Sequence, residues 1–406
     1  MNASQQIIDT LCSDYYDGRG YFNTGDRRAA SFISEQFKNI GLDPYYKNSY
    51  YHNFSLNVNT FPGIVSITTS KKSLSPGHEF IISPDAPSIQ SKPLTVNHVT
   101  KEVLLDKTGY KKLLKLDWET NLLMFDDITH DKTTQKRYDK LLKKYTNPIT
   151  IRVMQKLTWS VSRIQNDKVT ISVLPDVLSD KDEITVNIEA KLINNYKTRN
   201  VVGKIVGTEQ PDSIIFVTGH YDHLGRMGEA CIMPGANDNA SGIAMILDLA
   251  SYYVDNPPKY TMVFIAFAAE EAGLVGSYFF VQDLAKSTPL GSIRFVVNMD
   301  LMGSGQEGIM AVNGAVFTKE YELLESINEA NKYLPQTKKR GKAANSDHYF
   351  FTEAGVPSFF FYLMGPYSHY HDVDDTRENL TLELEPYNGS FRLIRDFVNA
   401  LMFQEK

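Results

Sequence analysis

Hydrophobic and polar positions follow a regular rhythm in the C-terminal part of the chain, from about residue 183 onward. Short runs of apolar, often β-branched residues alternate there with longer segments whose apolar residues recur at helical spacing. Unbroken apolar runs are typical of strands buried on both faces, and a 3.6-residue period is typical of amphipathic helices. The pattern predicts strands over 214–218, 262–267, 293–297 and 358–363, and helices over 242–253, 274–284, 319–331 and 387–403.

Strands that alternate with helices of this length are typical of an open sheet covered on both faces. We therefore expect an α/β fold with a mainly parallel, doubly wound sheet flanked by helices. A further amphipathic helix is expected over 26–42, with Gly41 as its stop signal.

The stretch from 60 to 182 has a different texture. Strand-like runs at 64–68, 122–125 and 149–154 are separated by polar, lysine-rich loops, and a basic helical segment is expected over 134–145. This stretch has no histidine or carboxylate cluster with ligand spacing. We predict that 60–182 is an inserted, mostly-β accessory domain, and that 1–59 and 183–406 together form the main domain.

The composition is that of an ordinary globular protein. The 406 residues are 42% hydrophobic and 22% charged, and the net charge of −6 argues against non-specific nucleic-acid binding. Cys12 and Cys231 are too few for a disulfide scaffold, and one bridge or two free thiols both fit. No apolar run reaches the roughly 18 residues of a membrane helix. The first residues lack a signal peptide, so the chain is expected to be either cytoplasmic or an exported protein without its signal.

Histidines and carboxylates stand where the predicted strands end. Carboxyl ends of neighbouring strands meet at one edge of an open α/β sheet, where ligands bind. Singly, each cluster could consist of turn and cap residues. Jointly they favour a site for two divalent metals. The clusters are His220-Tyr221-Asp222, Asn237-Asp238-Asn239 in a Gly-rich loop, Glu270-Glu271, Asn298-Met299-Asp300, and His371 in the polar loop 367–376.

Spacing suggests roles for some of these side chains. Asp222 stands two residues after His220, on the same side of an extended chain, and can orient its ring. His223 faces the other way and is expected to be structural. Of Glu270 and Glu271, one can bind metal while the other accepts a proton from a metal-bound water.

The inventory is sufficient for two ions that share one carboxylate. His220, Asp238 and Asp300 can hold one ion, and Asp238, Glu271 and His371 the other. His369 would face the same way as His371, so spacing does not choose between them. Histidine and carboxylate ligands without cysteine suit zinc, and also cobalt or manganese.

Four motifs resemble the co-catalytic zinc aminopeptidase family, which includes bacterial leucyl aminopeptidases, glutamate carboxypeptidase II, glutaminyl cyclases and the transferrin receptor ectodomain. The likeness covers about 195–406, and Asp17-Gly18-Arg19-Gly20 also resembles the opening segment of that family. The insert resembles, more weakly, a protease-associated domain. The motifs are Gly219 to Gly225, Gly235 to Gly242, Ala269 to Ser277, and Asn298-Met299-Asp300.

The resemblance assigns a role to each matching position. It implies that Asp222 orients the first ligand, that Asp238 bridges the metals and that Glu270 is the general base. It implies that Asp375 orients the last histidine, and that His348 contacts substrate or holds a loop. The implied metal ligands are His220, Asp238, Glu271, Asp300 and His371, with His369 as the rival of His371.

The function implied is that of a di-zinc aminopeptidase acting on peptide or protein N-termini. The alternatives are another exopeptidase, such as a dipeptidase or a glutamate carboxypeptidase type, a glutaminyl cyclase, or a non-catalytic receptor-like relative. The last two are disfavoured because ligands for two metals and a base are all present. The resemblance favours an exported, periplasmic or extracellular location without a membrane span.

Overall fold

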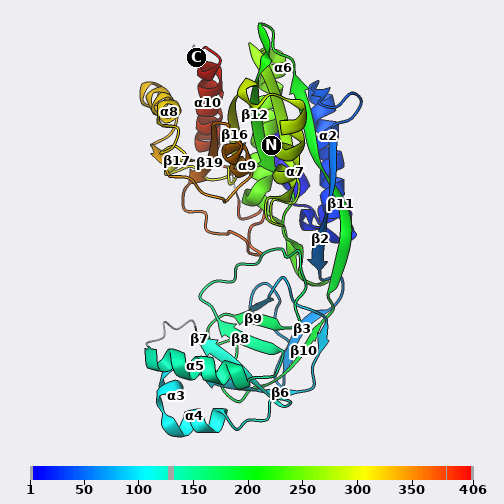
Figure 1. The fold of residues 1–406 in the computed structure, drawn as a ribbon, viewed down its shortest axis with the longest axis vertical. Helices are drawn as coiled ribbons and strands as arrows, with labels where there is room; N and C mark the ends of the chain where they lie inside the picture. The colour runs from blue at the N-terminus through cyan, green and yellow to red at the C-terminus, as the bar shows by residue number, and fades with distance from the viewer. Residues whose placement is uncertain (1–2, 127–131, 381, 404–406) are drawn as a thin grey trace.

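The computed structural model describes residues 3–126, 132–380 and 382–403. It contains a main unit and a second unit, each built around its own sheet (Figure 1). We use "second unit" for residues 65–188, from β3 to β10. Residues 1–2, part of the chain start considered above for a signal peptide, lie outside the described residues.

A nine-stranded sheet forms the centre of the main unit. Its middle strands β15, β12, β16 and β19 are parallel, but β1, β2 and β11 on one side and β17 on the other pair antiparallel with their neighbours. The expected mainly parallel sheet is therefore corrected to a mixed one. In sheet order the strands are β1 (Asp43–Pro44), β11 (Lys191–Ile205), β15 (Tyr260–Phe267), β12 (Gln210–His220), β16 (Ile293–Met299), β19 (Ser358–Met364), β17 (Gly308–Val312) and β18 (Thr337–Lys339), with β2 (Tyr51–Thr60) paired to β11.

Helices cover both faces of this sheet, as the apolar strands predict. Alternate residues of β12 show why: Ile215 and Val217 pack into one hydrophobic cluster, and Phe216 packs into another on the opposite face. The first face is covered by α1 (Ala3–Leu11), α2 (Gly25–Ile40), α6 (Ser241–Asp255), α8 (Thr318–Asn331) and α10 (Leu384–Leu401), and the second by α7 (Val275–Ser287) and α9 (His348–Glu353).

The second unit contains an eight-stranded sheet with three helices. Strands β6 to β9 are parallel, whereas β3, β4, β5 and β10 pair antiparallel, so this sheet is mixed as well. The strands are β3 (Val65–Thr69), β4 (Phe80–Ile82), β5 (Ile89–Gln90), β6 (Leu94–Val99), β7 (Asn121–Asp126), β8 (Ile149–Val153), β9 (Val169–Val173) and β10 (Glu183–Ile188), and the helices α3 (Lys101–Leu105), α4 (Lys107–Leu113) and α5 (Lys132–Lys144).

The connection between the units differs from the boundary we expected. Strand β10 pairs with β3 and β6, so residues 183–188, which we expected in the main domain, belong to the second sheet. The long strands β2 and β11 then run side by side from the second unit into the main unit (Figure 1). Polar residues interrupt the apolar ones along both strands, so neither strand has the unbroken apolar run on which the prediction of strands relied.

Two further observations complete the fold. Cys12 and Cys231 are free thiols, and Cys231 is buried in the core of the second unit beside the short hairpin of β13 (Gly225–Arg226) and β14 (Ile232–Met233). Among the described residues, none of the helices combines the length and apolar character needed to span a bilayer.

Candidate metal centre

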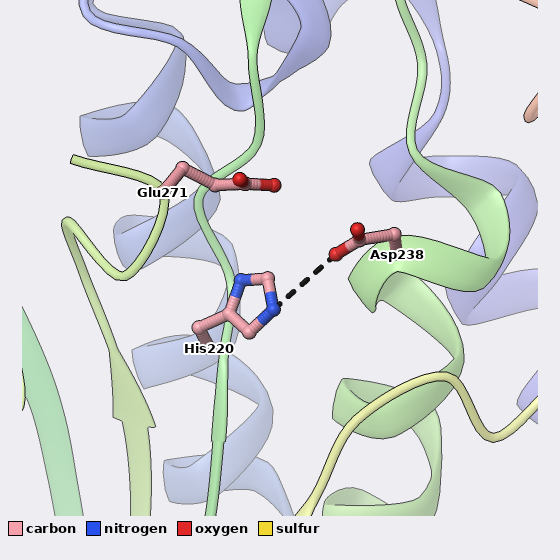
Figure 2. A group of neighbouring side chains, drawn as sticks. All are labelled: His220, Asp238 and Glu271. Carbon is pink, nitrogen blue, oxygen red and sulfur yellow. Dashed lines mark ion pairs between the residues drawn. The ribbon is translucent and has the colours of Figure 1, made fainter. Parts of the chain in front are cut away.

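The predicted side chains meet at the carboxyl edge of the parallel strands. His220 is the last residue of β12, Asp300 directly follows β16, and Glu270 and Glu271 follow β15. Asp238 comes from the turn Ala236–Ala240 that leads into α6, and His371 from the loop after β19. Figure 2 shows both carboxylates near the ring of His220, with Glu271 above it and Asp238 to its right. All five clusters singled out in the sequence are thus brought together.

Asp238 lies at the centre of the site, and its two carboxylate oxygens face different partners. Its Oδ1 is 3.3 Å from His220 Nε2, which is also 3.3 Å from Asp300 Oδ1. Its Oδ2 is 3.1 Å from His371 Nε2, which is 3.2 Å from Glu271 Oε2. The arrangement is two histidine–carboxylate pairs joined by one carboxylate. This is the geometry that the ligand inventory anticipated.

His371 and His369 are now distinguished by position. His371 Nε2 faces Asp238 and Glu271, whereas His369 Nδ1 lies 3.4 Å from Asp372 in the same loop. His371 has a left-handed backbone (φ 56°), which turns its side chain away from the alternation that we assumed for an extended segment.

The buried carboxylates shift the pKa values of the groups around them. Burial raises the pKa of Glu270, and the neighbouring charges of Glu271, Asp347 and Asp300 raise it further, well above its usual value. Burial alone lowers the pKa of His371, but the carboxylates of Glu271 and Asp238 outweigh it and raise the pKa to about 11. A site with this excess of negative charge is suited to cations.

Asp222 acts on the glutamates more than on the histidine it was expected to orient. Its Oδ1 accepts the backbone N–H of Glu270 at 3.1 Å, and its Oδ2 accepts Tyr21 Oη–H at 2.8 Å. The ring of His220 is held instead by the main-chain carbonyl of Asp222, 3.1 Å from Nδ1, while the carboxylate is 3.9 Å away. Asp222 therefore fixes both the first histidine and the glutamate pair.

Asp375 also differs from expectation. Its carboxylate accepts the backbone N–H groups of Asn237 at 2.8 Å and Asp238 at 3.0 Å, and the hydroxyl of Tyr367 at 2.7 Å. It holds the Asp238 turn and does not orient His371. A contact across 138 positions of sequence leaves no local signal.

His223 and Ser346 support ligands in ways that the sequence analysis missed. His223 is fully buried, and its Nδ1 lies 2.8 Å from Glu271 Oε1. Ser346 Oγ donates to Asp300 Oδ2 at 3.1 Å and accepts from Asn298 Nδ2 at 2.8 Å. Such contacts orient metal ligands. The adjacency of His223 to a ligand motif was the one available signal.

His348 lies away from the reacting groups. It is fully buried beside the ring of Phe360, 5.5 Å between ring centroids, and burial lowers its pKa to about 4. Its two ring nitrogens are buried without a hydrogen-bond partner among the described residues, and its two expected roles, contact with substrate or support of a loop, stay predictions.

A cavity of about 310 Å³ opens over the site. His220, Asp238, Glu270, Asp300 and His371 form its polar floor. Its walls are mostly aromatic or apolar, with one arginine and one amide: Leu301, Arg340, Asn345, Phe360, Tyr362 and Tyr370.

Comparison with known proteins finds similarity to peptidases. Residues 200–389 match the profile described as peptidase family M28. The chain is 31% identical over 255 residues to aminopeptidase YwaD of Bacillus subtilis, covering 59% of this chain and 53% of that protein. It is 39% identical over 129 residues to a probable zinc metalloprotease of Pyricularia oryzae, covering 30% of this chain and 25% of that protein. The match thus spans about half, or less, of these curated relatives.

The fold is similar to that of solved aminopeptidases. The Bacillus subtilis zinc aminopeptidase BSAP superposes with a TM-score of 0.71 at 17% identity, covering 99% of this chain and 95% of that one. An aminopeptidase from an Aneurinibacillus species gives a TM-score of 0.63 at 18% identity, covering 97% and 92%. At these identities the likeness shows the fold.

Proposed function

We propose that this chain, which belongs to peptidase family M28, is a zinc-dependent aminopeptidase that removes residues from peptide N-termini. The observation that carries the proposal is the position of Asp238, whose two oxygens each face a histidine–carboxylate pair. A carboxylate shared in this way is what a two-metal hydrolytic site requires.

The residues present fit zinc. The donor set is histidine and carboxylate without cysteine, and Asp300 Oδ1, which lies 3.3 Å from His220 Nε2, is buried without a hydrogen bond among the described residues. His220, Asp238 and Asp300 would hold one ion, and Asp238, Glu271 and His371 the other. Bound zinc would supply Lewis-acid chemistry, polarising the scissile carbonyl and lowering the pKa of water.

Glu270 is proposed as the general base. It borders the cavity beside His220 and Asp300, and no hydrogen bond engages its carboxylate among the described residues. Its backbone N–H is anchored on Asp222, which keeps the side chain aimed into the cavity. Glu270 would accept a proton from the attacking water and return it to the departing amine as the carbon–nitrogen bond breaks.

The cavity walls suggest the substrate. Phe360, Tyr362 and Tyr370 offer aromatic surface to an apolar N-terminal side chain. Arg340 donates to Tyr362 Oη at 3.4 Å, and no ion pair among the described residues includes it. The arginine favours a carboxylate near the scissile bond. This observation supports the second candidate, an exopeptidase acting on dipeptides or on C-terminal glutamate.

One set of assays separates these functions. Aminoacyl-p-nitroanilides with varied side chains are compared with their N-acetylated forms, with dipeptides and with peptides that end in glutamate, each with and without a chelator. We expect cleavage of the free-amine substrates, lost on chelation and restored by zinc. Cleavage confined to N-blocked substrates would overturn the aminopeptidase assignment.

A further inference from the structure

The loop that carries His371 lies against the second unit. It follows β19 and extends from the main unit toward the second unit (Figure 1). Two hydrogen bonds join His371 to Trp159 of the second unit: Trp159 N–H donates to the His371 carbonyl at 2.9 Å, and His371 Nδ1 lies 2.9 Å from the Trp159 carbonyl. One residue of the second unit thus contacts both the backbone and the ring of His371.

The contact with the ring determines which nitrogen faces the site. A carbonyl oxygen only accepts, so Nδ1 must carry a proton to make this bond. Nε2 then faces Asp238 and Glu271, 3.1 and 3.2 Å away. A metal-binding histidine held in this way has its tautomer and ring direction fixed by the partner of its other nitrogen.

The backbone contact supports a conformation that a non-glycine residue rarely adopts. His371 has φ 56°, in the left-handed region. Such a residue persists only where its surroundings hold it in place, because this backbone conformation is strained for a residue with a side chain. The hydrogen bond from Trp159 N–H to the His371 carbonyl is part of that support.

Trp159 is itself firmly anchored. Its side chain is buried, Nε1 donates to the Ile82 carbonyl at 2.8 Å, and its ring lies 5.9 Å from that of Phe61. Nearby, Lys156 Nζ donates to the Ser368 carbonyl at 2.6 Å and lies 3.3 Å from Asp372 Oδ2. The second unit therefore holds the loop on both sides of His371.

Apolar packing also holds this loop against the second unit. Val373 packs against the hydrophobic core of the second unit. Gly77 has φ 84°, and a Cβ there would lie 2.3 Å from Val373 Cγ1, so the missing side chain makes room for the valine. The position of Val373 therefore depends on a glycine at position 77 of the second unit.

We propose that Trp159 is a positioning residue for the metal centre, through which the second unit presents His371 to its zinc. The proposal rests on the proposed function only in that His371 binds metal. It predicts that a substitution of Trp159 lowers the affinity for one zinc ion and leaves the affinity for the other unchanged.

The test is zinc affinity, measured by competition with a chelator on the full chain. Trp159→Ala keeps the backbone N–H and carbonyl that contact His371 but removes the buried ring that anchors them, so we expect the more weakly held zinc to bind roughly 10- to 100-fold less tightly, the usual effect of disturbing the support of a metal ligand. The other zinc should stay as tight as in the parent chain. Saturating zinc should restore kcat, which a general structural defect would not allow. The matched control is Trp118→Ala, which alters the other tryptophan of the second unit, one that packs on Tyr145.

The possible outcomes are distinct. A folded Trp159→Ala chain that binds two zinc ions as tightly as the parent overturns the proposal, and so does equal weakening in the Trp118→Ala control. If Trp159→Ala does not fold, the test uses Lys156→Met, at a half-exposed position. A zinc affinity several-fold lower than that of the parent chain then supports the proposal, and an unchanged affinity overturns it. Failure of the proposed function would instead appear as a parent chain that binds zinc without hydrolysing free-amine substrates.

Discussion

Glu270 is the residue on which turnover is expected to depend most. Glu270→Gln removes the proton acceptor but keeps the size of the side chain and leaves the five proposed ligands in place. We predict that kcat/KM falls roughly 100- to 10,000-fold, the usual contribution of a positioned base. Zinc content by metal analysis should stay unchanged. A variant with near-normal turnover would disprove the assignment of Glu270 as the base.

His371 and His369 form a natural pair for comparison. His371→Ala should lose one zinc and most activity, because Nε2 of His371 faces Asp238 and Glu271. His369→Ala should keep two zinc ions and normal activity, because His369 faces Asp372. Zinc stoichiometry and turnover on the same preparations check this. The reverse result would move the ligand to His369.

Arg340 is expected to influence which substrates enter. A guanidinium in the cavity repels a basic N-terminal side chain. We predict that Arg340→Ala raises kcat/KM for a lysyl substrate relative to a leucyl one by about 5- to 10-fold. The matched control is Lys342→Ala in the same loop, since Lys342 is already paired with Glu353. An unchanged ratio of the two kcat/KM values would show that Arg340 does not determine substrate specificity.

Residue types at strand ends were enough to anticipate the set of side chains that meet at the site. His220, Asp300 and the glutamates follow strands whose apolar runs are unambiguous. The supporting contacts could not be anticipated. The bonds from the Asp375 carboxylate to the Asp238 turn and from Trp159 to His371 join residues 137 and 212 positions apart, and nothing local marks them.

At the scale of elements, the segment before α2 is tied to the site through Arg19. Its fully buried guanidinium donates to the carbonyls of Tyr221, Leu11, Pro234, Gly235 and Asp238, at 2.6–3.2 Å. It joins the N-terminal helix region to both loops that carry His220 and Asp238.

Loss of this arginine should therefore be costly. Arg19→Met leaves several buried carbonyls without donors, and each costs about 1–3 kcal/mol. We predict that the free energy of unfolding falls by roughly 4 kcal/mol or more, measured by urea denaturation. Arg27→Met, in α2, removes one hydrogen bond to the exposed Lys197 carbonyl and a cation–π contact with the Tyr196 ring, and should cost only about 1 kcal/mol. Equal losses in the two variants would contradict this account.

Elements with strong periodicity were predicted well, and polar ones were not. The helices and the four buried strands expected after residue 183 are all present, with ends shifted by a few residues. Strand β11 was not predicted, because Asn194, Asn195, Lys197 and Arg199 break the apolar pattern. Strand order and direction depend on pairing between distant segments, which explains why the mixed sheet was not foreseen.

At the scale of the whole molecule, the zinc ions are expected to contribute to stability. Each bound ion stabilises the folded state by mass action, roughly 4 kcal/mol when free zinc is 1,000-fold above Kd. Chelation also leaves Asp238, Glu270, Glu271 and Asp300 close together with only the histidines His220 and His371 to offset their charge. We predict a lower midpoint of thermal unfolding in chelator, restored by zinc and not by magnesium. An unchanged midpoint would argue against a bound metal.

The two-unit organisation was expected from the change of texture along the chain, but its junction was not. The boundary moved because β10 pairs within the second sheet. The resemblance of the second unit to a protease-associated domain, and an exported location, stay predictions.

The measurement that tests the central claim most directly is a zinc titration of metal-depleted protein, followed by hydrolysis of leucine p-nitroanilide. We predict no turnover without metal, a rise as zinc is added, and full turnover at two zinc ions per chain, with N-acetylated substrate left intact throughout. Turnover that is independent of zinc, or absent at every zinc ratio in a folded chain, would contradict it.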